Sequence, residues 1–254
     1  MQMKFHPLKC KVMHLGSNNQ RHEYRMKKDD GSYHTLESTT VEKDLGVFID
    51  TSLSFTNHCQ NKVNTANKIL GCIRHTFKNM DAEIFLLLYK SMVRPHLEFS
   101  SCVWNPHHKY NIDALERVQR RATKLVPELR DLTYTERLQK LNLETLQYRR
   151  TRADLLEVYR ITNGHHHLNQ HCRCEKCPSK TMLQPTLSRN TRGNSKKLQI
   201  QVGTGPRKHF FSQRISPLWN NLSEKTVTSQ NINSFKNNLN SEIAGMKFDF
   251  KFSY

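Results

Sequence analysis

Metal-ligating side chains are densest between residues 165 and 177. The group comprises His165, His166, His167, His171, Cys172, Cys174 and Cys177. Cys174 and Cys177 have the spacing of one half of a structural zinc site. The other half would have to come from the histidines or from Cys172, and neither offers a second pair at comparable spacing. We therefore predict a loop with free thiols and no metal site, which a zinc titration of this segment would test.

Asp29 and Asp30 are the only adjacent carboxylates in the chain. Paired carboxylates can hold catalytic magnesium. This pair instead follows two lysines and precedes Gly31, without an apolar strand on either side, which is typical of a turn. The sequence also lacks a nucleophile elbow, a phosphate-cradling glycine loop and an HExxH motif. We predict no catalytic residue and no cofactor, so the chain is not an enzyme on its own.

Basic side chains recur with helical spacing at Arg117, Arg120, Arg121 and Lys124. They lie opposite an apolar stripe that begins at Leu115, so a helix packed by that stripe would present the row to a phosphate backbone. The alternative is a solvated face with Asp113–Arg117 and Glu116–Arg120 ion pairs. Arg149, Arg150 and Arg152 form a second basic group to which the same interpretations apply, with Asp154 as a local partner for Arg150.

The positive charge is concentrated in one part of the chain. The formal net charge is +18, and residues 176–223 contain nine basic residues and no acidic residue. Counterion release favours such a stretch on a nucleic acid. A solvated loop, an anionic membrane surface and a ribosome-like assembly are the competing interpretations. The basic residues are Lys176, Lys180, Arg189, Arg192, Lys196, Lys197, Arg207, Lys208 and Arg214.

Cysteine content and hydropathy bear on the compartment. The seven cysteines are irregularly spaced and no secretory signal precedes them, so we predict a reducing, intracellular compartment with free thiols. The longest apolar run, Ile84–Tyr89, is far too short to cross a bilayer. We predict no membrane partner and no small-molecule substrate.

The elements that position these residues divide into four segments. Residues 1–53 indicate short antiparallel strands, including Lys11–Leu15 and Val41–Ile49, the latter interrupted by Gly46. Residues 54–164 have helical periodicity, residues 165–208 form a basic, loop-rich connector, and residues 209–254 form a small helical segment. The predicted fold is mainly α, with a small sheet before a helical bundle.

Within the bundle, prolines and glycine mark the expected helix ends. An apolar helix over Asp81–Arg94 should be buried on most sides and end at Pro95. A helix through Leu115 should stop at Pro127, and a helix over Leu143–Ile161 should be capped near Gly164. The apolar cluster that starts at Phe210 should dock on the bundle, and a last short helix is expected over Ile232–Ile243.

Several of these motifs, in this order, resemble the C-terminal part of a non-LTR (LINE-type, jockey-like) retrotransposon reverse transcriptase. The most specific is Leu88–Phe99 followed by Trp104–Pro106. The others are Met3–Met13, Glu42–Val47, Ala66–Gly71, Leu115–Lys124, Thr191–Gly193, Phe210–Arg214 and Leu218–Asn220. The similarity covers nearly the whole chain, but residues 165–182 replace a short linker of the family.

The resemblance implies a remnant of the palm edge, a thumb-like bundle and a connector. The carboxylates of the family's polymerase site come from segments before Met1, so this chain lacks them, and magnesium belongs only to the intact polymerase. Lys9 matches a lysine thought to assist the departure of pyrophosphate. The implied partner is an RNA–DNA or DNA duplex, bound with low sequence specificity, and the implied location is nuclear or cytoplasmic. The alternative is a domesticated or decayed protein-interaction module; the sequence does not predict an oligomeric state.

The expected nucleic-acid contacts combine the resemblance with the charge pattern. They are Lys9, Lys11, Arg117, Arg120, Arg121, Lys124, Arg149, Arg150, Arg189, Arg192, Lys196, Lys197, Arg207 and Lys208.

Overall fold

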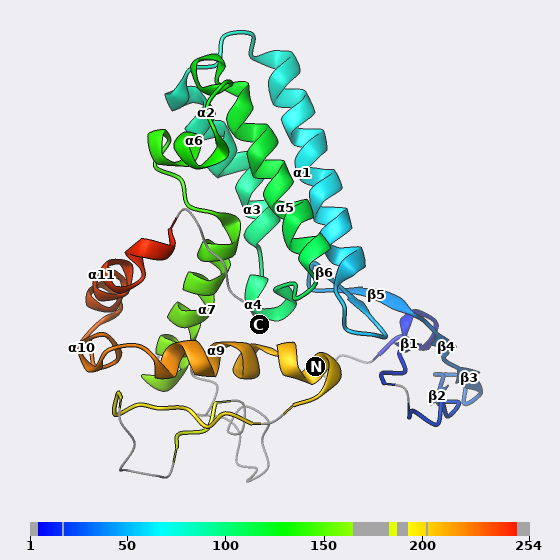
Figure 1. Ribbon diagram of the computed structural model, residues 1–254. Coiled ribbons are helices and arrows are strands. Elements are labelled where there is room, and N and C mark those ends of the chain that lie inside the picture. Colours follow the sequence, from blue (N-terminus) through cyan, green and yellow to red (C-terminus); the bar gives the residue numbers. More distant parts are fainter. Residues whose placement is uncertain (1–4, 17, 165–182, 187–192, 202, 248–254) are drawn as a thin grey trace. The chain divides into compact units, whose positions relative to one another are not determined.

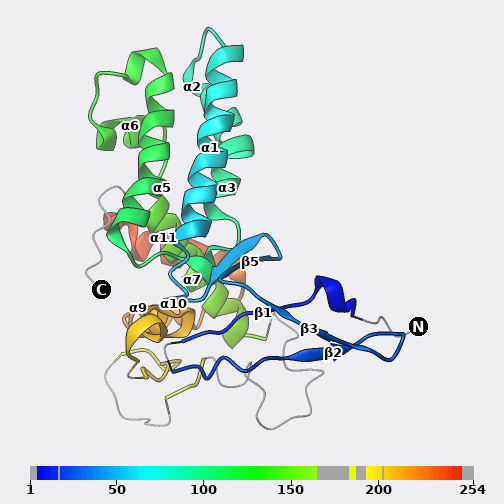
Figure 2. The ribbon, with the colours of Figure 1, turned by 90° about the vertical axis from the view of Figure 1, so that its right-hand side faces the viewer.

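The computed structural model describes residues 5–16, 18–164, 183–186, 193–201 and 203–247. It is mainly helical, with 56% helix and 9% strand, as the sequence predicted. The chain divides into two compact units, residues 1–58 and 59–254. Figures 1 and 2 show the elements of each unit. None of the described helices is both long and apolar enough to traverse a bilayer.

The first unit contains three two-stranded sheets. After the short 3-10 turn η1 (Pro7–Lys9), β1 (Lys11–Val12) pairs with β4 (Glu37–Ser38), β2 (Arg25–Lys27) with β3 (Tyr33–Thr35), and β5 (Val41–Asp44) with β6 (Val47–Asp50). The last two pairs are antiparallel, as predicted, but β1 and β4 are parallel. The sequence did not predict this parallel pair. A parallel pair needs a long crossover, and the β2–β3 hairpin lies within it.

The turn predicted at Asp29 and Asp30 is present, whereas Gly46 has a different role from the predicted one. Asp30 accepts from the amide of Ser32 at 2.8 Å in the turn between β2 and β3, which confirms the assignment of the Asp pair. Gly46 does not interrupt one strand; it separates two. Leu45 has φ +44° and Gly46 has φ +89°, and two successive positive φ angles match the tight hairpin turn that suits strand twist.

The second unit begins with a helical bundle. Its helices are α1 (Thr56–Thr76, which starts at the boundary), α2 (Ala82–Leu88), α3 (Arg94–Glu98), α4 (Ser101–Trp104) and α5 (Lys109–Ala122). The π-turn η2 (Tyr89–Val93) connects α2 to α3 without a break. Pro95 therefore does not end the helix as predicted. The amide of Arg94 bonds to the carbonyl of Tyr89, five residues back, and this wider turn accommodates a proline that has no amide to donate.

The α2–α3 segment is buried along one face only. Phe85, Tyr89, Val93 and Leu97 recur every four residues and are at most 1% exposed. Leu87, in contrast, is 70% exposed. The prediction that this segment is buried on most sides is wrong, because a helix that packs by one stripe leaves its other apolar side chains in solvent.

The chain after α5 changes direction through short turns. The 3-10 turns η3 (Thr123–Leu125) and η4 (Pro127–Leu129) precede α6 (Tyr134–Lys140) and α7 (Leu146–Thr162). The α5 helix thus stops before Pro127, as predicted. Thr133 and Glu136 form a capping box at the start of α6. Gly164 follows α7 with φ +69°, in agreement with the predicted cap.

The C-terminal helices share a hydrophobic core with α7. They are η6 (Gly205–His209), α9 (Phe211–Asn220), α10 (Glu224–Val227), α11 (Ile232–Glu242) and η7 (Ala244–Met246). Tyr159 of α7 stacks on Phe235 of α11 with ring centroids 4.3 Å apart, and Trp219 of α9 is fully buried in the same cluster. The predicted docking of this segment on the bundle is confirmed, and Figure 1 shows α9 crossing α7.

Candidate nucleic-acid interface

Helix α5 and the turn η3 that follows it present a row of four basic side chains. Its buried stripe is Leu115, Val118 and Ala122, each at most 1% exposed. Arg117, Arg120, Arg121 and Lys124 lie on the other side of the helix and are all exposed. We call these four residues the α5 basic row. The 3.6-residue periodicity predicted this arrangement correctly.

The acidic residues Asp113 and Glu116 do not form the ion pairs with the row that the alternative interpretation expected. Glu116 is only 8% exposed, and its carboxylate accepts from the Tyr134 hydroxyl and from the amide of Leu146 at 3.1 Å. It is therefore wrong to place Glu116 on a solvated face beside Arg120. Arg117 donates to the main-chain carbonyl of Asp113 at 3.2 Å.

A buried polar network underlies the row. Gln119 donates to the Tyr134 hydroxyl and to the Glu144 carbonyl, both at 2.9 Å, and accepts from the Tyr89 hydroxyl. Burial raises the pKa of Glu116, although the hydrogen bond from Tyr134 opposes that shift. Burial also raises the pKa of Tyr134 well above its ordinary range. This network was not predicted from the sequence. The one feature of the sequence that points to it is that Glu116 and Gln119 directly follow the apolar residues Leu115 and Val118, so they lie next to the buried stripe.

Helix α1 lies beside α5 in both views of the bundle (Figures 1 and 2). Arg121 donates to the side-chain oxygen of Asn67 on α1 at 2.8 Å. Gln60, Asn64 and Asn67 follow one another at helical spacing, and the amide of Gln60 donates to Asn64 at 2.9 Å. Arginines next to side-chain amides form a surface that could donate hydrogen bonds to phosphate and sugar oxygens.

Arg149 and Arg150 do not lie on an open helix face. Arg149 forms ion pairs with Glu98 and with Glu144. Arg150 is 1% exposed, and its Nε donates to the Asn105 side chain at 3.0 Å. Each guanidinium is held by a partner from another part of the chain, so neither residue lies on the open helix face that the sequence predicted.

Asp154 was expected to pair locally with Arg150. Its ion pair is instead with Arg214 of α9, at 2.9 Å. Arg150 reaches Asp154 through Asn105, whose amide donates to that carboxylate at 3.2 Å. The expectation of a local Arg150–Asp154 pair is therefore wrong, because Asp154 pairs with Arg214, which is distant in the sequence.

The remaining predicted contacts belong to several parts of the chain. Lys9 and Lys11 belong to the first unit, where Lys11 pairs with Glu42 at 2.7 Å. In the second unit, Lys196 donates to the side chain of Asn163 at 2.8 Å, and Lys197 is half-buried. Arg207 and Lys208 are exposed on η6. Outside the described residues lie Arg189, Arg192 and the whole histidine and cysteine cluster of residues 165–177.

Three histidines that the sequence analysis did not single out together lie close in space. His107 stacks on His209 with centroids 4.0 Å apart and an interplanar angle of 5°, and His108 lies 4.0 Å from His107. Burial and the neighbouring His209 and His108 lower the pKa of His107 to about 4. The described part of the chain contains no group of three or more His, Cys, Asp or Glu side chains arranged to hold a metal.

Comparison with known proteins yields one relative of undescribed function. No protein-family model matches the chain. No solved structure matches it either. An uncharacterized protein of Caenorhabditis elegans is 28% identical over 131 residues, which cover 49% of this chain and 64% of the relative. The match therefore spans less than two thirds of that relative, and its name carries no activity to transfer.

Proposed function

We propose that this chain is a nucleic-acid-binding, thumb-like part of a LINE-type reverse transcriptase that grips a template–primer duplex without catalysing polymerisation. The observation that carries the proposal is the α5 basic row, which is exposed on a helix whose opposite face is buried. The motif resemblance to that family supports it independently. In this role the row tracks the phosphate backbone, and low sequence specificity follows because phosphate contacts carry no base information.

Electrostatics supports a polyanionic partner over a neutral one. The chain has a net charge of +18, and such a charge raises the local concentration of nucleic acid at its surface. Each neutralised phosphate releases condensed counterions, so the affinity should fall steeply with salt. The proposed contacts with the duplex therefore predict a steep slope of log affinity against log salt concentration.

The test is binding of the purified chain to a labelled RNA–DNA duplex across a salt series. The variant to compare replaces Arg117, Arg120, Arg121 and Lys124 together with glutamine. Because four phosphate contacts would be lost, the slope of log affinity against log salt should become shallower by roughly 3 to 4. The side chains are exposed, so the variant should fold.

A matched control removes the same charge elsewhere. Lys27, Lys90, Lys140 and Lys225 are exposed on four other elements, and their joint replacement by glutamine lowers the net charge equally. We expect a much smaller change in slope for this control. Equal slopes for both variants would mean that the net charge, and not the α5 basic row, holds the duplex.

A second candidate is a protein-interaction module. It is favoured by the apolar side chains that α2 and η2 expose, since Ile84 is 37%, Leu87 70% and Met92 48% exposed. An apolar interface is much less sensitive to salt than a phosphate contact. If the folded chain fails to bind the duplex at low salt, the reverse transcriptase proposal fails and the protein-interaction module becomes the favoured hypothesis.

A further inference from the structure

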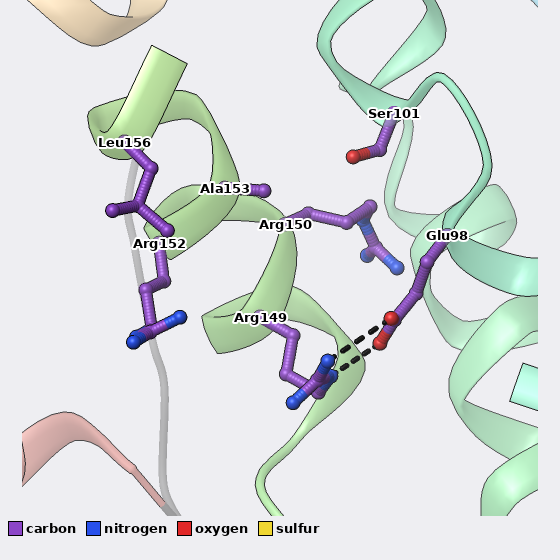
Figure 3. A pocket seen from close by; sticks show the side chains of 7 residues that line it. All are labelled: Glu98, Ser101, Arg149, Arg150, Arg152, Ala153 and Leu156. Carbon is purple, nitrogen blue, oxygen red and sulfur yellow. Dashed lines mark hydrogen bonds and ion pairs between the residues drawn. The ribbon is translucent and has the colours of Figure 1, made fainter. Parts of the chain in front are cut away.

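Residues of α7, the end of α3 and the start of α4 line a pocket of about 190 Å³ in the second unit. Figure 3 shows its lining, which consists of Glu98, Ser101, Arg149, Arg150, Arg152, Ala153 and Leu156. Three arginines and one glutamate therefore line this small space. The α5 basic row contributes no side chain to it, so the pocket is separate from the proposed duplex grip.

The single lining carboxylate is already balanced. Both carboxylate oxygens of Glu98 accept hydrogen bonds from Arg149, and the distance from Arg149 Nη2 to Glu98 Oε2 is 3.1 Å. On its other side, Arg94 Nε lies 3.8 Å from Glu98 Oε2. Glu144 also pairs with Arg149 at 3.1 Å. Two arginines thus balance two glutamates, and Arg150 and Arg152 add further positive charge to the lining.

Fixed partners hold the other two guanidiniums in place. Arg150 Nε donates to Asn105 at 3.0 Å, and Arg152 Nε donates to the Asn240 side chain of α11 at 2.7 Å. Figure 3 shows Arg150 extending from α7 toward Ser101 and Glu98. A guanidinium remains charged at every physiological pH, and the Nε bond holds each of these two side chains in a fixed orientation.

We propose that this pocket binds a phosphate group. Arginine is the residue best suited to this ligand, because its planar fork matches two phosphate oxygens at once. Arg150 is nearly fully buried, and a fixed positive charge in a region of low dielectric attracts an anion more strongly than one in water. The anchored side chains lose little conformational entropy on binding.

The volume limits which phosphate compound can enter. Pockets for drug-sized ligands measure about 300–1,000 Å³, and this one is smaller, at about 190 Å³. It accommodates a phosphate group but not a whole nucleotide. The group can come from free inorganic phosphate or from the 5′-terminal phosphate of a nucleic-acid strand, two sources with the same chemistry.

The first test titrates inorganic phosphate into the full chain by calorimetry at constant ionic strength. Two variants change the pocket without removing the buried Arg150. Arg152→Gln removes a lining charge, and Ala153→Glu adds a carboxylate to the lining. Each should weaken phosphate binding by about tenfold or more, the effect of one charge-assisted hydrogen bond. Arg160→Gln on the same helix is the control, because Arg160 pairs with Glu157 and does not line the pocket; it should leave the affinity unchanged.

A second arm separates the two phosphate sources. The affinity of the chain is compared for one duplex with a 5′-phosphate and for the same duplex with a 5′-hydroxyl. Tighter binding of the phosphorylated duplex, lost in Arg152→Gln, identifies a strand terminus as the ligand. Equal affinities together with phosphate binding identify free phosphate.

Either of two results overturns the proposal: folded wild-type chain that takes up no phosphate, or uptake that both pocket variants leave unchanged. The α5 row variant should bind phosphate normally, so failure of the duplex grip and failure of the pocket are distinguishable.

Discussion

Asp154 of α7 and Arg214 of α9 form an ion pair in which Arg214 Nε lies 2.9 Å from the Asp154 carboxylate, with side chains only 2% and 5% exposed. The same guanidinium donates to the carbonyl of Cys102 at 2.7 Å and to that of His209 at 3.1 Å. One arginine therefore ties together α4, α7 and the turn before α9. This ion pair is one polar connection between the bundle and the C-terminal helices, beside their shared apolar core.

Removing one member of this pair should be strongly destabilising. Arg214→Met leaves the Asp154 carboxylate buried without its counter-charge and two carbonyls without a donor, which should cost about 3–5 kcal/mol. Urea unfolding at neutral pH measures the loss. Arg207→Met, at an exposed position on η6, is the control and should change the free energy of unfolding by less than about 0.5 kcal/mol. A loss of similar size in both variants would show that the ion pair is not the cause.

Periodicity in the sequence predicted the surface of α5 but not its interior. Arg120 and Lys124 are exposed because their spacing opposes the Leu115 stripe, a relation local to one helix. Glu116 and Asp154 are charged and were read as surface residues, since a charged side chain is rarely fully buried unless paired. Their partners, Tyr134 and Arg214, come from other helices, and no local pattern in one sequence reveals such pairings.

Pro95 illustrates a second limit. Proline predicts a helix end because it lacks an amide and collides with the preceding turn. Here the π-turn over Tyr89–Val93 relieves both problems, and the buried stripe of Phe85, Tyr89, Val93 and Leu97 continues through it. Tertiary packing along that stripe outweighed the local signal. Propensity alone does not contain this information.

The buried Glu116 should make stability depend on pH. Burial raises its pKa above the ordinary value of 4.5, so the folded state retains this proton where the unfolded state has lost it. The contribution to stability is then fully present below pH 4.5 and is lost as pH rises through the raised folded pKa. Relative to Glu116→Gln, the wild type should lose stability over that window by at most about 1.4 kcal/mol per pH unit.

Urea unfolding of both proteins between pH 4 and pH 8 checks this expectation. Glu136→Gln is a suitable control, since Glu136 is exposed and the Thr133 hydrogen bonds lower its pKa. A difference between wild type and Glu116→Gln that is flat with pH would mean that the pKa of Glu116 is the same in the folded and unfolded states, which would contradict the prediction.

The stacked histidines should act in the opposite direction. Burial and neighbouring His209 and His108 lower the pKa of His107 to about 4, so the folded state keeps this ring neutral while the unfolded state takes up a proton near its ordinary pKa of 6.5. Stability from this group is present above pH 6.5 and is lost as pH falls toward 4. His107→Phe retains a ring to stack on His209 but cannot titrate, and should flatten that part of the stability profile. An NMR titration giving His107 a pKa near 6.5 would contradict the prediction.

The β5–β6 turn is built from a residue poorly suited to it. Leu45 has φ +44° and is 89% exposed, so it accepts a left-handed conformation without gaining burial. A side chain other than Asn, Asp or Gly loses roughly 1–2 kcal/mol in that conformation. Leu45→Asn creates Asn-Gly, the favoured pair for this hairpin, and should stabilise the turn by about 1 kcal/mol. Gly46→Ala should destabilise it, because Gly46 has φ +89°.

Hydrogen exchange at the amides of the β5–β6 ladder measures both effects without requiring the two units to unfold together. If Leu45→Asn leaves protection unchanged while Gly46→Ala reduces it, the strain at Leu45 is absent and only the glycine position requires a left-handed backbone.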